Sequence, residues 1–190
     1  MKLSKKHVIK IPKHVKVLYS VEENILLLLG LEHQKTLKCD FRLLTNRKTN
    51  AIYVTETPSK TLINLRRKHL HALHGTTVAH IKSYITEVST TSYKKIGLKG
   101  VGFKVFLTKS VADELLQFKL GFSHSIYYKI PKTVDIKVSK QVYLFLFGMS
   151  HCSLGQAAAN IRCHKIPDCY KGKGILHENE KVKIKEGKKI

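Results

Sequence analysis

The sequence predicts an α+β fold of two similar, duplicated domains, each an antiparallel sheet packed by a helix, followed by a basic C-terminal tail. Three observations support this prediction. Segments of the first half recur in the second, apolar and polar residues alternate early in each copy, and a helix-like segment follows late in each copy. The 190 residues, of which 43% are hydrophobic, suffice for one large domain or two small ones.

The duplication is visible as two matched pairs of segments. Lys10–Val17 reads against Lys129–Ile136, and Gly75–Lys82 reads against Gly155–Arg162 in the same order. The two segments of each pair are not the same distance apart in the sequence: the second-copy segment is nearer to its match in the second pair than in the first. The first copy must therefore carry extra residues between its two matched segments. The block Thr36–Thr57 fits this excess, and we expect it to form an added hairpin.

Strands are predicted early in each copy. Apolar and polar residues alternate over Val15–Tyr19 and over Val134–Val138, which is typical of half-buried strands. Each segment continues to a short apolar strand that ends in glycine, Ile25–Gly30 in the first copy and Val142–Gly148 in the second. Both copies therefore begin with the same pair of strands.

Helices are expected late in each copy, from about Ser59 into the Tyr84 region and over roughly Ser150–Cys163. The small residues Ala157–Ala159 suit close packing of the second helix on a sheet. The polar stretch Val88–Ser92 is suited to a linker between the copies. The expected domains are residues 1–90, with the inserted hairpin, and residues 91–190, with the tail.

Three glycines after the expected linker, Gly97, Gly100 and Gly102, superficially suggest a phosphate-binding loop. A dinucleotide fingerprint needs a different spacing and a following helix, whereas Phe103–Leu107 continues as a strand. We therefore interpret these glycines as a bulge or a tight strand turn, which would also let an RNA backbone come close.

The charge balance indicates a polyanionic partner. Lys and Arg number 35 against 13 Asp and Glu, which gives a formal net charge of +22. A surplus of this size repels itself, and nucleic acid or an anionic membrane would neutralise it. Only five of the basic residues are Arg, and lysine favours recognition of phosphates and shape over base readout. An AT-rich coding genome would produce the same bias.

The second half carries a recognisable series of motifs. They are Leu98–Phe103, Leu120–His124, Ile130–Pro131, Gly155–Ala158, Ile161–Arg162, Pro167–Ile175 and a tail at Lys185–Lys189. The series closely resembles the bacterial-type large-subunit ribosomal protein L6 family, and Pro167–Ile175 (PDCYKGKGI) is similar to that family's signature. The resemblance is strong from about Tyr93 to Ile190 and weak over the first half.

The resemblance implies two α+β domains that arose by duplication. It also implies a structural constituent of the large ribosomal subunit that binds rRNA near the sarcin–ricin loop, where translational GTPases dock. It implies no catalytic role and no cofactor. The partners expected are large-subunit rRNA, neighbouring ribosomal proteins and, transiently, translational GTPases, with no membrane span and no small-molecule substrate.

The candidate rRNA-binding residues combine positive charge, an aromatic ring and glycines. Lysines suit phosphates, Tyr170 offers an aromatic face and a hydroxyl, and Gly172 and Gly174 let backbone N–H groups approach an RNA backbone. His124 belongs to an expected hairpin turn, Gly121–His124, where it is an RNA contact or a packed or solvent-exposed histidine. The predicted set is Lys94, Lys95, Lys99, His124, Arg162, Lys165, Tyr170, Lys171, Gly172, Lys173, Gly174, Lys181, Lys183, Lys185, Lys188 and Lys189.

The tail from Ile175 to Ile190 alternates between charged and apolar residues around Lys181–Lys185. In an isolated chain we expect such a tail to be partly disordered. We expect it to order along RNA on a ribosome.

Cysteines and histidines do not predict a metal site. Cys152, Cys163, His164 and Cys169 are the candidate zinc ligands, but they contain no C-x-x-C pair and their spacing fits no common zinc ribbon or finger. The spacing of His69, His71 and His74 does not align three ligands on one helical face, which favours a basic helix that faces RNA. The few, irregularly spaced cysteines suggest no disulfide framework and a reducing compartment.

Other functional classes find less support. The sequence has no H-E-x-x-H, no G-x-S-x-G and no Walker loop, and an RNA-modifying enzyme would need a methyl-donor or nucleotide pocket. A peripheral membrane protein would need a basic helix with a large apolar face. An RNA-modifying or other RNA-binding protein outside the ribosome remains the alternative.

The sequence suggests an organelle-encoded mitochondrial protein, because it is enriched in Lys and Ile, carries cysteines where the bacterial family members are expected to have other residues, and shows no obvious presequence. We expect a ribosome of the mitochondrial matrix, with the bacterial cytoplasm or a plastid as alternatives.

Overall fold

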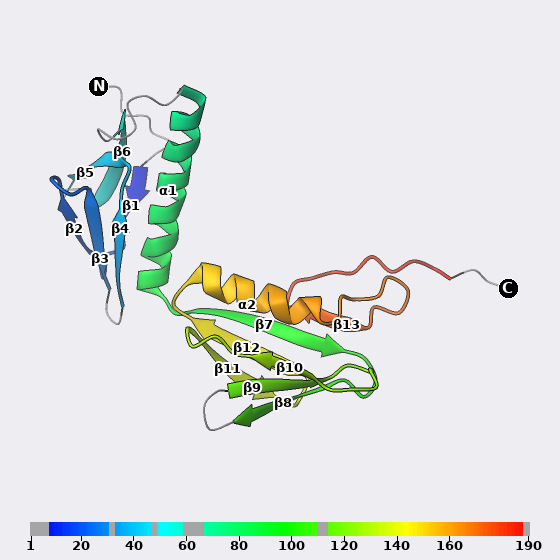
Figure 1. Cartoon of the computed structure of the whole chain (residues 1–190). Coiled ribbons are helices and arrows are strands. Elements are labelled where there is room, and N and C mark those ends of the chain that lie inside the picture. The colour runs from blue at the N-terminus through cyan, green and yellow to red at the C-terminus, as the bar shows by residue number, and fades with distance from the viewer. Residues whose placement is uncertain (1–7, 31–32, 47–48, 59–66, 110–113, 188–190) are drawn as a thin grey trace. The chain divides into compact units, whose positions relative to one another are not determined.

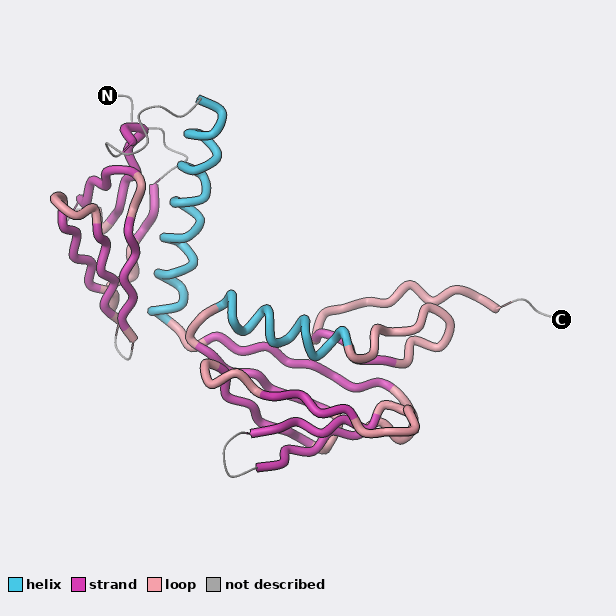
Figure 2. The backbone as a smooth tube through the Cα atoms, viewed as in Figure 1, coloured by secondary structure: helices cyan, strands magenta, loops and turns pink. Residues whose placement is uncertain are grey.

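The computed structural model describes residues 8–30, 33–46, 49–58, 67–109 and 114–187 (Figure 1). The chain divides into two compact units, Met1–Thr90 and Thr91–Ile190. Each unit combines antiparallel sheets with one helix, as the sequence predicts for the fold class (Figure 2).

The described part of the first unit holds two three-stranded antiparallel sheets, in the orders β1-β6-β5 and β2-β3-β4. One helix, α1, packs on these strands through an apolar stripe, Val78, Ile81, Ile85 and Val88, spaced at three or four residues. Its elements are β1 (Val8–Lys10), β2 (Lys16–Ser20), β3 (Ile25–Leu29), β4 (Gln34–Lys38), β5 (Phe41–Asn46), β6 (Ala51–Pro58) and α1 (Arg67–Ser89).

The described part of the second unit holds one three-stranded and one four-stranded antiparallel sheet, in the orders β10-β9-β8 and β11-β12-β7-β13. Helix α2 and both sheets contribute to one core, which includes Leu144, Leu146 and Leu154 with none of their surface exposed. Its elements are β7 (Ser92–Lys99), β8 (Lys104–Lys109), β9 (Glu114–Lys119), β10 (Ile126–Lys129), β11 (Val134–Ser139), β12 (Tyr143–Gly148), α2 (His151–Cys163) and β13 (Gly174–His177).

The repeated Ile-Pro-Lys segments fold in the same way in both units. In the first, the Val15 N–H donates to the Pro12 carbonyl at 3.1 Å, and in the second the Val134 N–H donates to the Pro131 carbonyl at 3.0 Å. Each turn joins two strands, β1 to β2 and β10 to β11, and the hairpins β2–β3 and β11–β12 follow. The two units thus share one turn and the three strands around it.

The block Thr36–Thr57, expected as an added hairpin, contains most of β4, β5 and β6. β5 and β6 do form a hairpin, but β6 also pairs with β1 and β4 pairs with β3. In the second unit β9 pairs with β10 and β7 pairs with β12 in the same way. The block therefore forms integral strands that correspond to β7, β8 and β9, which precede the repeated segment in the second unit and follow it in the first.

Helix α1 ends at Ser89, beyond the predicted end near Tyr84, because Ile85 and Val88 continue its buried stripe. Residues 59–66, where the helix was expected to begin, lie outside the described residues. The boundary between the units, after Thr90, falls within the predicted linker Val88–Ser92, but the connection is shorter than expected because Val88 and Ser89 end α1 and Ser92 begins β7.

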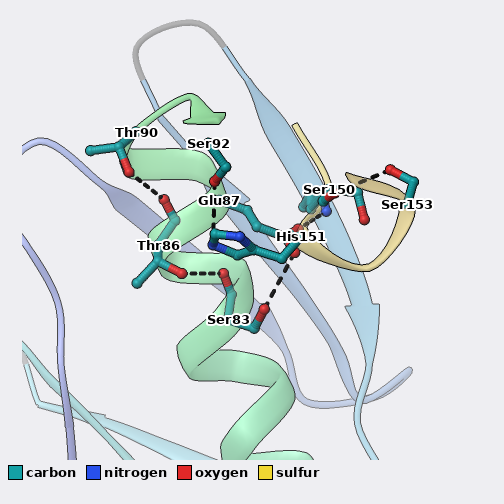
Figure 3. Close-up of polar contacts among 9 residues, drawn as sticks. Ser83, Thr86, Glu87, Thr90, Ser92, Ser150, His151 and Ser153 are labelled. Carbon is teal, nitrogen blue, oxygen red and sulfur yellow. Dashed lines mark hydrogen bonds and ion pairs between the residues drawn. The ribbon is translucent and has the colours of Figure 1, made fainter. Parts of the chain in front are cut away.

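Hydroxyl groups around the end of α1 bond back to helical carbonyls. Thr86 Oγ1 donates to the Ser83 carbonyl at 2.7 Å, and Thr90 Oγ1 donates to the Thr86 carbonyl at 3.2 Å (Figure 3). The hydroxyls thereby bond to carbonyls of the last helical turn. In the second unit, Ser92 Oγ lies 3.3 Å from His151 Nε2 and joins β7 to the start of α2 (Figure 3).

Helix α2 spans His151–Cys163, in agreement with the prediction. Of the three small residues expected to pack on a sheet, Ala157 and Ala158 are buried and Ala159 is exposed. The glycine-rich segment between β7 and β8 is a tight turn, as expected. Gly102 has φ +76°, and a Cβ on Gly100 would lie 2.8 Å from the ring of Phe103.

His164 follows α2 and packs among aromatic rings. Its ring centroid lies 5.8 Å from that of Tyr128 and 6.1 Å from that of Phe118. Its Nε2 is buried without a hydrogen-bond partner among the described residues, and burial lowers the pKa of the imidazole. The folded protein therefore favours neutral His164.

A lowered pKa predicts that stability is lost as the pH falls below the ordinary histidine value of about 6.5, because the unfolded chain then binds the proton more readily. His164→Phe should remove this contribution, so its urea midpoint should fall less between pH 7 and pH 5 than that of the unmodified protein. Parallel pH profiles for the two proteins would contradict the assignment.

Candidate nucleic-acid interface

The segment Pro167–Ile175, here called the signature loop, forms a turn closed by its own hydrogen bonds. The Asp168 carboxylate accepts from the backbone N–H groups of Tyr170 at 3.3 Å and Lys171 at 3.4 Å. The Asp168 carbonyl accepts from the Gly172 N–H at 2.9 Å, and the Asp168 N–H donates to the Lys173 carbonyl at 3.0 Å. This network closes the turn through the Asp168 side chain and backbone.

The two glycines of the signature loop meet requirements within the chain. Gly172 is buried with φ +65°, a conformation that favours glycine. A Cβ on Gly174 would lie 2.6 Å from the Cα of Pro167, closer than packed atoms allow. We predicted that both glycines let RNA approach the backbone, but the Gly172 N–H is occupied by Asp168. An RNA contact at Gly172 and Gly174 stays a prediction.

The signature loop presents three side chains to solvent. Tyr170 is 56% exposed, and Lys171 and Lys173 are also exposed. Lys99, at the end of β7, adds a further cation, because its Nζ lies 3.7 Å from where a Cβ on Gly172 would be. The structure thus brings four of the predicted residues together around one rigid turn.

The described part of the tail is tied to the signature loop. The Lys185 N–H donates to the Cys169 carbonyl at 2.8 Å, and Val182 is half-buried. Lys181, Lys183 and Lys185 are exposed. The other two predicted tail residues, Lys188 and Lys189, lie outside the described residues.

Arg162 is engaged within the protein. Its Nε donates to both carboxylate oxygens of Glu180, at 2.9 and 3.1 Å, and its Nη2 donates to the same carboxylate. The carboxylate also accepts from the His177 N–H at 3.2 Å. The hydrogen bond from Arg162 is the main reason that the pKa of Glu180 lies below its ordinary value. The structure therefore gives Arg162 an architectural role, which joins α2 to the segment after β13.

The sequence analysis did not single out Glu180. Its only signal was its place as one of few acidic residues within a basic tail. A second carboxylate in this segment, Glu178, accepts from Lys95 Nζ at 3.4 Å. Lys94, also in β7, is exposed near the start of α2. Its Nζ lies 3.5 Å from the position that a Cβ on Gly155 would occupy.

The turn between β9 and β10 presents an aromatic pair. His124 is exposed and stacks on Phe122, with ring centroids 6.0 Å apart and planes inclined by 21°. Lys165 Nζ lies 4.2 Å from the centre of the Phe122 ring. The expected hairpin turn is confirmed, because β9 and β10 pair in antiparallel register. Phe122 was not a predicted site residue, although it lies within the predicted turn.

The described cysteines and acidic residues form no metal-ligand cluster of three or more groups. Cys152 and Cys163 are exposed, whereas Cys39 is buried in the first unit and burial raises the pKa of its thiol to about 11. Within the described residues, no helix has the length and hydrophobicity needed to cross a membrane.

Gly174→Ala should destabilise the signature loop, because its Cβ would clash with the Pro167 backbone at a φ of +157°. We expect a loss of about 2 kcal/mol in urea denaturation and faster amide exchange in β13. Gly187→Ala is the matched control, because a Cβ there has no atom within 4 Å. Equal stability of the two variants would contradict the packing argument.

Glu180→Gln should cost about 1 kcal/mol of unfolding free energy at pH 7, since it removes a half-buried ionic fork. The carboxylate pKa is lowered, so the stabilisation is present above its ordinary value and is lost as the pH falls through the lowered one. The difference between the two proteins in urea denaturation should therefore be largest at pH 7 and should shrink as the pH falls below the ordinary glutamate value. Glu178→Gln, which removes a more exposed pair, should cost less at pH 7.

Comparisons with known proteins match the region that holds this interface. The family model described as ribosomal protein L6 matches residues 100–178. Large ribosomal subunit protein uL6 of Buchnera aphidicola is 41% identical over 115 residues, which cover 60% of this chain and 63% of that protein.

Two further relatives carry the same name. The protein of Mycoplasma capricolum is 39% identical over 122 residues, which cover 64% of this chain and 66% of that protein. The protein of Nitrosospira multiformis is 36% identical over 122 residues, which cover 64% of this chain and 67% of that protein. The chain thus matches about two thirds of the length of these relatives. Together with the signature loop, these similarities show that the chain belongs to the bacterial-type ribosomal protein L6 family.

Proposed function

We propose that this chain is a structural constituent of the large ribosomal subunit that binds large-subunit rRNA with its second unit and tail. One observation carries the proposal: the signature loop holds Tyr170, Lys171 and Lys173 exposed on a turn that is already closed by hydrogen bonds. The relatives named large ribosomal subunit protein support the assignment to the subunit.

The mechanism is neutralisation of phosphates combined with a fit of shapes. Lysine ammonium groups bind phosphate as mobile point charges. Hydrogen bonds within the turn would lower the backbone entropy lost on binding. Lys99 and the tail lysines Lys181, Lys183 and Lys185 extend the same basic surface. The interaction therefore requires no catalytic group and no cofactor.

We place the bound rRNA near the sarcin–ricin loop and the docking region of translational GTPases, as the family resemblance implies. Neighbouring ribosomal proteins and, transiently, those GTPases are the proposed partners. The proposed location is the ribosome of the mitochondrial matrix, for which the enrichment in Lys and Ile and the four cysteines are the support. The bacterial cytoplasm and a plastid are the alternatives, and the relatives above are bacterial.

Lys171→Ala combined with Lys173→Ala should weaken rRNA binding and assembly. Each phosphate contact on a duplex contributes about 0.9 to the log–log slope of affinity against salt, so loss of both should reduce the slope by about 1–2. Binding to large-subunit rRNA is measured over a salt series, and incorporation is measured by sedimentation of the subunit after a high-salt wash.

The matched control is Lys16→Ala with Lys38→Ala, which removes the same charge from exposed positions of the first unit. An unchanged slope and normal incorporation of the signature-loop variant would remove Lys171 and Lys173 from the interface. If the unmodified chain runs free of the large subunit, the ribosomal assignment itself is wrong.

A further inference from the structure

The four-stranded sheet of the second unit has an aromatic face opposite its core. Leu144 and Leu146 of β12 are fully buried, and the alternation along the strand puts their neighbours on the other face. We call this surface the aromatic face; it consists of Tyr93, Tyr143, Phe145 and Phe147, with Lys95 and Lys137.

Strand register makes these side chains neighbours. Phe147 is opposite Tyr93 and Phe145 is opposite Lys95 across β12 and β7, while Lys137 of β11 is opposite Phe145 on the other side. Tyr143 is opposite Gly97, and a Cβ on Gly97 would lie 3.6 Å from the Tyr143 ring. The rings therefore form a row along one strand, with cations on the strands at both sides.

The rings are open to solvent and are associated with cations. Tyr93 is 59% exposed and Tyr143 is 41% exposed, while Phe145 and Phe147 are half-buried. Lys95 Nζ lies 5.3 Å from the centre of the Tyr143 ring and 5.9 Å from that of Phe145. Lys137 Nζ lies 5.7 Å from the centre of the Phe147 ring. An apolar surface of this kind is unusual on a polar chain unless something binds it.

A groove lies beside the aromatic face, along β7 and β13. It has a volume of about 380 Å³, and its lining includes Tyr143, Lys95 and Lys99. Lys99 in turn lies beside Gly172. A strand of RNA held by the signature loop would therefore find the next cation and the first ring on the same side of β7.

We propose that the aromatic face binds unpaired RNA nucleotides, with bases stacked on the Tyr and Phe rings and phosphates bound by Lys95 and Lys137. Unpaired bases expose their π-faces, whereas a duplex buries them between neighbouring base pairs. The proposal rests on the proposed function, because it assigns a second contact to the same class of ligand.

Charge favours RNA over an apolar protein as the occupant. A protein that covered the rings with apolar residues would also have to bury two ammonium groups, which is costly without counter-charges. RNA supplies phosphates for the lysines and bases for the rings. Three described acidic groups lie near the face or its groove: Asp135, opposite Phe147, Glu178, which accepts from Lys95, and Glu180, which is paired with Arg162. A phosphate would therefore compete with Glu178 for Lys95.

The test uses the full chain and two probes, a ten-nucleotide oligouridine RNA and a blunt RNA duplex. Tyr143→Leu with Phe147→Leu keeps apolar bulk and removes two rings. We expect this variant to bind oligouridine about tenfold or more weakly, since each stacked base contributes strongly, and to bind the duplex as before. The matched control is Phe106→Leu on β8, whose ring lies 5.7 Å from Lys119 Nζ and outside the aromatic face.

Cross-linking gives a second readout that does not depend on a variant folding. Oligouridine that contains 4-thiouridine should cross-link to peptides with Tyr143 or Phe147 of the unmodified chain. Equal affinity of the variant and the control, or cross-links confined to the signature loop, would overturn the proposal and favour an apolar protein as the occupant. Sedimentation of the same variant with the large subunit is a separate measurement. The proposed function is tested by the unmodified chain and by the signature-loop variant, whereas the aromatic face is tested by the RNA probes.

Discussion

The second unit depends on the pairing of β7 along both of its edges. β12 pairs on one side and β13 on the other, so β7 is a central strand whose alternation serves two purposes. Ile96 and Leu98 face the core, while Lys95 and Lys99 face the groove that leads to the signature loop. A shift of one residue in this register would bury the lysines and expose the core residues.

Paired in this way, β13 fixes the place of the signature loop. The loop leaves α2, turns at Asp168 and returns as β13, with the Ile175 N–H bonded to the Lys165 carbonyl at 2.9 Å. Gly174 permits this return because its backbone passes against Pro167. The fold thus presents Lys171 and Lys173 from a turn anchored at both ends, so a basic surface forms without an RNA template.

Local patterns predicted the features that depend on neighbouring residues. The proline turns, the helix over His151–Cys163 and the hairpin turn at Gly121–His124 follow from residues within one segment. The end of α1 was misread because Val88–Ser92 looks polar, whereas Ser and Thr hydroxyls bond to helical carbonyls there. The pairing of β4 and β6 with strands of the repeat depends on contacts between distant segments, which no local pattern encodes.

The candidate site likewise combines residues that a local pattern predicts with residues that only long-range contacts reveal. The lysines and Tyr170 could be selected from composition and motif, but the partner of Arg162 could not, because Glu180 lies after another strand. The aromatic face was also missed: Tyr143, Phe145 and Phe147 read as part of an apolar run, and only the sheet separates them from Leu144 and Leu146. A run that appears uniformly apolar in sequence therefore has one face in the core and one in solvent.

Carboxylates, which are scarce in this chain, form ion pairs between segments that are distant in the sequence. Glu87, Glu178 and Glu180 each join two separate segments: β4 to α1, β7 to the tail, and α2 to the tail. Without these carboxylates, the paired cations Lys35, Lys95 and Arg162 would add to the repulsion between the basic segments that meet there. Within the described residues, Lys171 and Lys173 have no such ion-pair partner. Acidic groups therefore offset positive charge where these segments meet, and the ammonium groups of Lys171 and Lys173 are available to an external anion.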